Sequence, residues 1–259
     1  MRAQEEKIIG FTIFEVIIVM VLIGIVSGLA YPNFSQWRKD RAVKNSAIKI
    51  RGLFLNTTAQ VQRGLYGFAQ VYANAEHTKS LTLADGTVVD EAVKGIFFVS
   101  RGMKQTSIPT QKSVRADIWN DPAERCLIPE GEEGEEGEEG NFWDDDGETS
   151  DKPEVSAFIL EDIGLNITGE AAVCFSKDGS LYGTQGGFIN DNTYFGSSVW
   201  AMYICEDKSS KDDDYATPCT DESGRIVEGI KYLYALSWSR FGNITLYKYN
   251  KDEEFSVVQ

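Results

Sequence analysis

The sequence predicts an α+β protein in which one long N-terminal α-helix, transmembrane and then amphipathic, packs on a small antiparallel β-sheet head. Three observations predict this class. Residues 11–31 form an apolar run that contains one charged residue. Residues 33–75 then carry apolar side chains mostly at steps of three and four, which is the spacing of one helix face. Residues 76–259 hold short strand patterns separated by turn sequences.

The composition of the 259-residue chain is that of a folded protein with no enzyme site. Hydrophobic residues make up 42% and aromatic residues 12%, which excludes global disorder. The net charge of −15 disfavours nucleic acid as a partner. The single histidine, His77, leaves little material for a catalytic triad or a histidine-rich metal site. We therefore expect a protein that is not an enzyme, with no catalytic residue, metal or cofactor.

The charge is distributed unevenly along the chain. Residues 130–151 contain twelve acidic residues and no basic one, and a second acidic loop covers residues 206–228. The first segment repeats Gly-Glu-Glu without apolar periodicity, so we expect a solvated insertion; its spacing fits an EF-hand calcium loop poorly. Residues 37–63 carry seven basic residues against one acidic residue. This basic stretch is a solvated helix face, a subunit contact or a contact with anionic lipid.

The apolar run of residues 11–31 is long enough for a membrane-spanning helix. Its 21 residues extend over about 30 Å, the thickness of the hydrocarbon layer. A cleaved secretory signal would be shorter and would end in small residues. A plain signal anchor leaves Glu15 unexplained, because an ionised carboxylate inside an apolar span is costly. A free amino group at Phe11 would be a natural partner for Glu15, and it requires cleavage after Gly10.

Residues 10–15, Gly-Phe-Thr-Ile-Phe-Glu, together with the apolar run that follows, resemble the class III signal peptide of type IV prepilins and pseudopilins. The resemblance implies that a prepilin peptidase cuts after Gly10 and that the new N-terminal Phe11 is methylated. It implies that Glu15 neutralises the N-terminus of a neighbouring subunit during assembly. Pro32 stands where many members of the family have a helix-kinking proline. A type IV pilin-like fold is therefore expected.

The same resemblance divides the chain into four parts. Residues 1–10 are the leader, 11–32 the transmembrane and assembly half of the helix, 33–75 its amphipathic half, and 76–259 an extracytoplasmic head. The implied function is that of a minor pilin or pseudopilin of a type IV pilus or type II secretion system. The implied partners are the peptidase, other pilin or pseudopilin subunits, and the assembly platform with its ATPase.

The implied location is the bacterial inner membrane, crossed once, with the head in the periplasm and the assembled subunit in a pilus or pseudopilus. Two alternatives remain open at this point. One is an adhesive or ligand-binding tip pilin, whose insertions would make the contacts. The other is an unprocessed, signal-anchored envelope protein, which would keep its leader.

The head is predicted to be rich in strands. Two short turn sequences, Asp85-Gly86 and Lys177-Asp178-Gly179, separate pairs of strand patterns as in hairpins. The pattern from Phe175 to Gly179 resembles the GspH/FimT-like subgroup of minor pilins. Some members of that subgroup bind DNA through a basic C-terminal stretch, which this chain lacks. The predicted strands are residues 81–84, 87–89, 95–100, 155–160, 171–175, 180–182, 199–205, 231–237 and 243–249.

All four cysteines lie in the predicted head: Cys126, Cys174, Cys205 and Cys219. An even number of cysteines in an oxidising compartment indicates disulfides. The sequence has no Cys-x-x-Cys pair, which disfavours a zinc site or a thioredoxin-type site. Three pairings are possible. We favour Cys205–Cys219, which would close the second acidic loop, with Cys126–Cys174 as the remaining pair. The pairing Cys174–Cys205 stays open.

Overall fold

The computed structural model describes part of the chain in detail. Neither the leader nor the acidic insertion, residues 1–10 and 130–151, is among the described residues. Side chains are left undescribed at residues 29–33, 81–82, 88–89, 154–155, 181–185 and 189–190. The described residues are 12–75, 81–82, 88–89, 95–103, 126, 154–167, 169–176, 181–185, 189–190, 194–195, 199–209, 216, 218–221, 223–239, 242–250 and 254–258.

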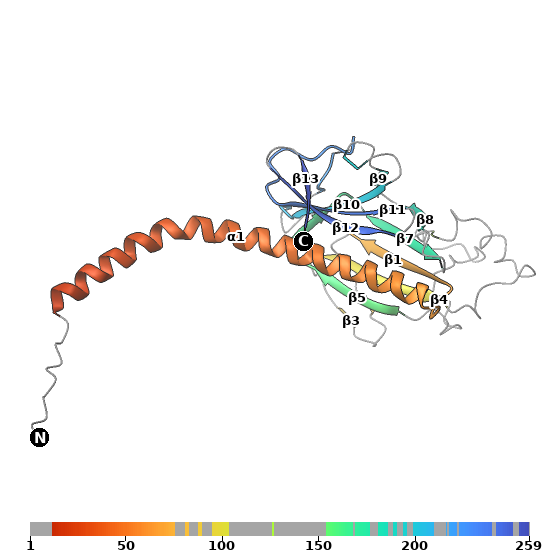
Figure 1. The fold of residues 1–259 in the computed structure, drawn as a ribbon, viewed down its shortest axis with the longest axis horizontal. Coiled ribbons are helices and arrows are strands. Elements are labelled where there is room, and N and C mark those ends of the chain that lie inside the picture. Colours follow the sequence, from red (N-terminus) through yellow and green to blue (C-terminus); the bar gives the residue numbers. More distant parts are fainter. Residues whose placement is uncertain are drawn as a thin grey trace, which may run out of the picture. The chain divides into compact units, whose positions relative to one another are not determined.

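A single helix, α1, runs from Ile13 to Gln62 (Figure 1). The chain divides into two compact units, Met1–Arg41 and Ala42–Gln259, so α1 contributes residues to both. The helix begins with a capped turn, because the backbone N–H of Glu15 donates to the Thr12 hydroxyl at 3.2 Å. A threonine side chain in this position satisfies one of the backbone donors that the first helical turn leaves unpaired.

The helix ends thirteen residues earlier than the predicted boundary at residue 75. Gly64 has φ of +76°, a conformation that glycine adopts without steric cost. Its N–H donates to Val61 O at 2.9 Å, and the N–H of Leu65 donates to Gln60 O at 3.1 Å. These two bonds and the left-handed glycine form the closing pattern that stops many helices. The predicted amphipathic half is therefore too long.

The residues after this stop form a strand, β1 (Phe68–Asn74). Phe68 and Tyr72 fitted the helical stripe because they are four residues apart. Residues four apart share a face in a strand as well as in a helix, so their spacing does not distinguish the two. Between them, Ala69 and Val71 are also buried, on the opposite face, as in a strand with two covered faces.

The strands of the second unit form two larger antiparallel sheets and one short hairpin. The five-stranded sheet has the order β5-β4-β1-β7-β8, and the six-stranded sheet has the order β13-β12-β11-β10-β6, with β9 paired to β10. The remaining strands are β2 (Leu81–Thr82), β3 (Val88–Val89), β4 (Ile96–Met103), β5 (Glu154–Leu160), β6 (Ile163–Leu165), β7 (Glu170–Ser176), β8 (Leu181–Gln185), β9 (Ile189–Asn190), β10 (Val199–Glu206), β11 (Leu233–Ser239), β12 (Ile244–Tyr249) and β13 (Phe255–Val257).

One apolar core joins the second half of α1 to both sheets, whose strands run beside the helix in Figure 1. Phe54 shows the arrangement, because its ring lies 6.0 Å from that of Phe175 in β7 and 5.3 Å from that of Trp238 in β11. Burying such a side chain stabilises the fold by about 1.5–3 kcal/mol. The buried stripe of α1 consists of Val43, Ala47, Ile50, Leu53, Phe54, Thr57, Thr58 and Val61.

Each sheet also has a covered outer face. The outer cluster of the five-stranded sheet contains Phe68, Tyr72, Val99 and the disulfide partners Cys126 and Cys174. The outer cluster of the six-stranded sheet contains Tyr203, Leu233, Ala235 and the disulfide partners Cys205 and Cys219. Strands β1, β7, β10 and β11 are accordingly buried on both faces along most of their length.

This arrangement corrects the predicted fold class. The prediction of a small antiparallel sheet in a type IV pilin-like fold is wrong, since the second unit is mostly β and holds two antiparallel sheets of five and six strands. A small sheet with one solvated face would show alternating burial along each strand. The central strands here show continuous burial, so each sheet needs cover on both sides. Neither that second layer nor strands β1, β6, β9 and β13 were predicted.

Candidate functional site

The predicted processing site lies at the N-terminal end of the chain. Gly10 and Phe11 are outside the described residues. Glu15 is described and lies exposed in the first turn of α1. Pro32 lies within the helical span of α1, and its side chain is outside the description. Glu15 is therefore the predicted assembly residue with a described environment.

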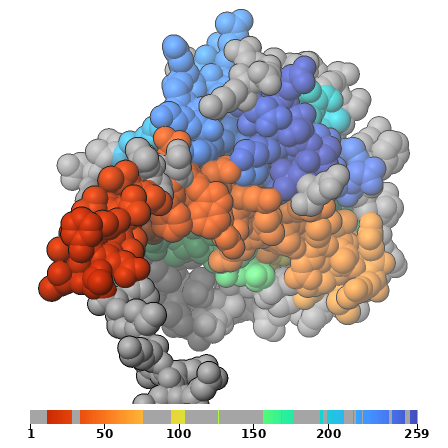
Figure 2. All heavy atoms as spheres, turned by 60° about the vertical axis from the view of Figure 1, so that its left-hand side comes forward, coloured from red at the N-terminus to blue at the C-terminus, as the bar shows by residue number. Residues whose placement is uncertain are grey.

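The first turns of α1 expose apolar side chains on every side. Figure 2 draws this part of the helix in red. Ile13 is 83% exposed and Phe14 is 69% exposed. A helix of a soluble domain buries one apolar stripe, whereas a helix that is apolar all round needs cover on all sides. The exposed large apolar residues here are Ile13, Phe14, Val16, Ile17, Ile18, Val19, Met20, Val21, Leu22, Ile23, Ile25 and Val26.

Glu15 occupies the third position of the helix after the capping residue Thr12. A carboxylate in the first helical turn is favoured by the partial positive charge of the helix N-terminus, by about 0.3–1 kcal/mol. Thr12 and Glu15 also match the Thr-x-x-Glu capping sequence. Thr12 was not predicted as a capping residue, although this spacing in the sequence is a signal for one. Glu15 thus has a local role in starting α1, separate from any role between subunits.

A short aromatic and basic turn follows the apolar turns. Phe34 is 55% exposed and Trp37 is 51% exposed, so these two residues lie outside the buried stripe although their spacing continues its pattern. Their rings stack with centroids 5.7 Å apart. The guanidinium carbon of Arg41 lies 5.1 Å from the centroid of the Trp37 ring, within the range of a cation–π interaction. The buried stripe begins only at Val43, in the second unit.

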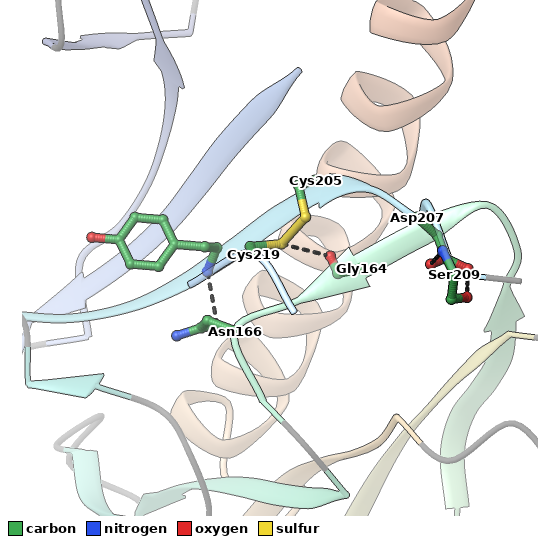
Figure 3. Close-up of a disulfide and its surroundings, with 7 residues drawn as sticks. Gly164, Asn166, Cys205, Asp207, Ser209 and Cys219 are labelled. Carbon is green, nitrogen blue, oxygen red and sulfur yellow. Dashed lines mark hydrogen bonds between the residues drawn. A yellow bond between two sulfur atoms is a disulfide. The ribbon is translucent and has the colours of Figure 1, made fainter. Parts of the chain in front are cut away.

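The two disulfides are those favoured from the sequence, Cys205–Cys219 and Cys126–Cys174. The first joins β10 to Cys219, which lies within the second acidic loop (Figure 3). The backbone N–H of Cys219 also donates to Leu165 O at 2.9 Å, which holds this part of the loop to β6. In a chain-entropy account, closing a loop of this length stabilises the folded state by about 3 kcal/mol.

The buried side-chain amide of Asn166 links the end of β6 to β10, close to the Cys205–Cys219 disulfide. The Asn166 Oδ1 accepts a hydrogen bond from the backbone N–H of Tyr203 at 2.9 Å (Figure 3). Asn166 lies just after β6, where regular pairing with β10 stops. Its side chain therefore satisfies a backbone donor of β10 that no longer faces a strand. At the start of the loop, Asp207 accepts from the N–H of Ser209 at 2.8 Å, which holds a local turn.

Among the described residues of the second unit, Tyr72 has a clearly shifted pKa. Burial raises the pKa of Tyr72 far above its ordinary value, and a hydrogen bond to Glu170 with the charge of that carboxylate adds to the effect. The Asn74 amide acts in the opposite direction. Within the described parts of the chain, no three histidine, cysteine, aspartate or glutamate side chains are placed to hold a metal ion.

Among the described residues, no helix has a stretch both long and apolar enough to cross a membrane. Comparison with protein-family models finds no match, and comparisons with curated proteins and with solved structures find none either.

Proposed function

We propose that the chain is a prepilin-like structural subunit, a minor pilin or pseudopilin of a type IV pilus or type II secretion system. It is processed after Gly10 and assembled through its N-terminal helix. The observation that supports this proposal best is the exposure of apolar side chains all around the first turns of α1. In a filament, the same turns of neighbouring subunits would cover this surface, and the hydrophobic effect would favour assembly.

In this proposal the chemistry of assembly is electrostatic. Cleavage after Gly10 creates a positive amine on Phe11, and the chain carries one carboxylate, Glu15, within the following apolar run. An unpaired charge among apolar helices is costly, and pairing with the amine of a neighbouring subunit removes much of that cost. The pair would thereby select the axial position at which one subunit joins the next.

Before assembly the subunit would reside in the inner membrane, with its head in the periplasm. The apolar run of the sequence continues to residue 31. The structure describes the side chains of this run as far as residue 28. The two disulfides of the second unit suit an oxidising compartment such as the periplasm. A prepilin peptidase, other pilin or pseudopilin subunits and an assembly platform with its ATPase would be the partners.

A minor subunit is favoured over a major one by charge. The insertion at residues 130–151 carries twelve acidic residues and no basic one. Dense repetition of this head along a filament would bring many such segments together, and like charges within about 10 Å repel each other at ordinary ionic strength. A subunit present in few copies avoids this repulsion.

The first test is to shear surface fibres from cells that make the chain and to identify the N-terminal peptide by mass spectrometry in fibres and membranes. N-methylated Phe11 in the fibres is the result expected for a pilin, and N-methylated Phe11 restricted to membranes is the result expected for a pseudopilin. An intact leader, residues 1–10, in both fractions would overturn the proposal.

The second test separates the assembly role of Glu15 from its role in the helix start. Glu15→Ala should leave processing at Gly10 intact and remove the subunit from filaments. Thr12→Ala is the matched control, since it weakens the helix start without removing the charge. Normal incorporation of the Glu15→Ala subunit would refute the role assigned to this carboxylate.

A further inference from the structure

The aromatic and basic turn of α1, which we call the Phe34–Trp37–Arg41 ladder, is the strongest unassigned feature of the first unit. Its three residues follow one another at steps of three and four, so they lie on one face of the helix. The stacked rings of Phe34 and Trp37 are both about half exposed. The side chain of Arg41 is exposed, and its guanidinium carbon lies 5.1 Å from the centroid of the Trp37 ring. The ladder is thus an ordered surface.

The direction of the ladder matters as much as its composition. Side chains of an α-helix lean toward its N-terminus, and here each member leans over the one before it. The apolar turns therefore come first, the aromatic rings next, and the guanidinium last. A bilayer presents the same order, from hydrocarbon through the interface, where tryptophan is enriched, to the headgroup phosphates. The turns from Ile13 to Val26, which expose apolar side chains, would be the part that enters the hydrocarbon.

The position of the ladder along the helix fits this order. From Ile13 to Phe34 a continuous helix rises by about 30 Å, which is close to the thickness of the hydrocarbon layer. The segment from Arg38 to Arg41 holds three basic residues and one acidic residue, Asp40. Basic residues at a membrane surface attract anionic lipid, by an amount that corresponds to about a fivefold change in association for each charge.

We propose that the Phe34–Trp37–Arg41 ladder is a membrane-interface anchor that binds anionic lipid headgroups through Arg38 and Arg41 and sets the depth of α1 in the bilayer. The proposal rests on the membrane stage of the function proposed above. An acidic surface of another protein is the competing occupant. Lipid is favoured because the aromatic rings lie between the apolar turns and the cations, an order that a protein surface does not require.

The test uses the full chain in vesicles of phosphatidylcholine that contain an equal mole fraction of either brominated phosphatidylcholine or brominated phosphatidylglycerol. Bromine quenches nearby tryptophan, and the difference between the chain and its Trp37→Phe variant isolates the signal of Trp37. We expect Trp37 to be quenched most by bromine placed near the interface. We expect brominated phosphatidylglycerol to quench it several-fold more effectively than brominated phosphatidylcholine, and this preference to fall as salt rises.

Two double variants with the same change in charge identify the residues responsible. Arg38→Gln/Arg41→Gln should lower the preference for phosphatidylglycerol by about fivefold for each arginine removed. Arg63→Gln/Arg225→Gln, which changes two exposed arginines of the second unit, should leave it unchanged. Equal quenching by the two lipids, or an equal effect of both double variants, would overturn the proposal.

A reporter in the apolar turns separates this proposal from the function on which it rests. Leu22→Trp in the Trp37→Phe chain should be quenched whenever α1 enters the bilayer. If this reporter is quenched and Trp37 is not, the ladder meets water or protein and the anchor is refuted, while the membrane stage stands. If neither tryptophan is quenched, both the anchor and the membrane stage are wrong.

Discussion

The hydroxyl groups of Thr57 in α1 and Ser100 in β4 lie 2.8 Å apart and form a buried hydrogen bond. The Thr57 hydroxyl also donates to Leu53 O at 2.8 Å, and a hydroxyl has one hydrogen. Ser100 is therefore the donor in the pair. Both residues are almost fully buried, at 1% and 0% exposure, so this bond is a polar link between the helix and the five-stranded sheet.

The direction of this bond predicts unequal effects of removing its two partners. Thr57→Val leaves the Ser100 hydroxyl buried without an acceptor and should lower the free energy of unfolding by about 1–3 kcal/mol. Ser100→Ala leaves Thr57 bonded to Leu53 and should cost less. The double variant should be more stable than Thr57→Val alone, because no donor is stranded. Urea unfolding of the full chain in detergent measures the stability of the two single variants and the double variant. If the effects of the two single variants simply add in the double variant, Ser100 is not the donor.

Two glycines of the same segment predict opposite effects of one substitution. Gly64→Ala places a side chain at φ of +76° and should destabilise the protein by about 1 kcal/mol. Gly52 lies inside α1, and outside the adjoining helix backbone no atom lies within 4 Å of an added methyl group. Gly52→Ala should therefore stabilise the protein by about 0.5–1 kcal/mol. Thermal unfolding measures the melting temperature of each variant. Shifts of the same sign for Gly52→Ala and Gly64→Ala would contradict the proposed end of the helix at Gly64.

The disulfide pairing predicts which peptides stay joined without reductant. Digestion under non-reducing conditions should yield one product that joins Cys205 to Cys219 and another that joins Cys126 to Cys174. A product that joins Cys174 to Cys205 would contradict the pairing. Replacing Cys205 and Cys219 together by serine should lower the free energy of unfolding by about 3 kcal/mol, because the unfolded chain gains the freedom of the opened loop.

The raised pKa of Tyr72 predicts a loss of stability in alkaline solution. In the unfolded chain this phenol loses its proton near pH 10, whereas in the folded chain it keeps it, so above about pH 10 the folded state binds more protons. Stability should then fall by up to about 1.4 kcal/mol per pH unit from this group. Tyr72→Phe should make the decline shallower, and Glu170→Gln should do so in part. The free energy of unfolding, measured by urea unfolding at a series of pH values, gives this decline for each protein. Equal declines above about pH 10 in the parent chain and in Tyr72→Phe would contradict the prediction.

The positions of many strands could be predicted from the sequence. The predicted strands at residues 95–100, 171–175, 199–205 and 243–249 correspond to β4, β7, β10 and β12 within a few residues. Runs of β-branched and aromatic residues favour strands locally, whatever the rest of the chain does. The buried helical stripe from Val43 to Val61 could be predicted for the same reason, because helical periodicity is a local property of the sequence.

Other features depend on contacts between distant residues. The strand β1 was assigned to the helix, since its partners β4 and β7 are remote in sequence and only their pairing decides between the two periods. Phe34 and Trp37 fitted the apolar stripe by spacing, but both side chains are about half exposed. Short edge strands such as β6 and β13 have too few residues to carry a periodic signal.

The sequence by itself determined the apolar run, the placement of acidic and basic segments, and most strand positions, since each is a property of neighbouring residues. The tertiary structure decided that two sheets share one core with α1, and it joined the cysteines into the pairs Cys205–Cys219 and Cys126–Cys174. The physical reason is that sheet order and two-sided burial follow from long-range pairing, whose free energy depends on the whole core and on no single segment.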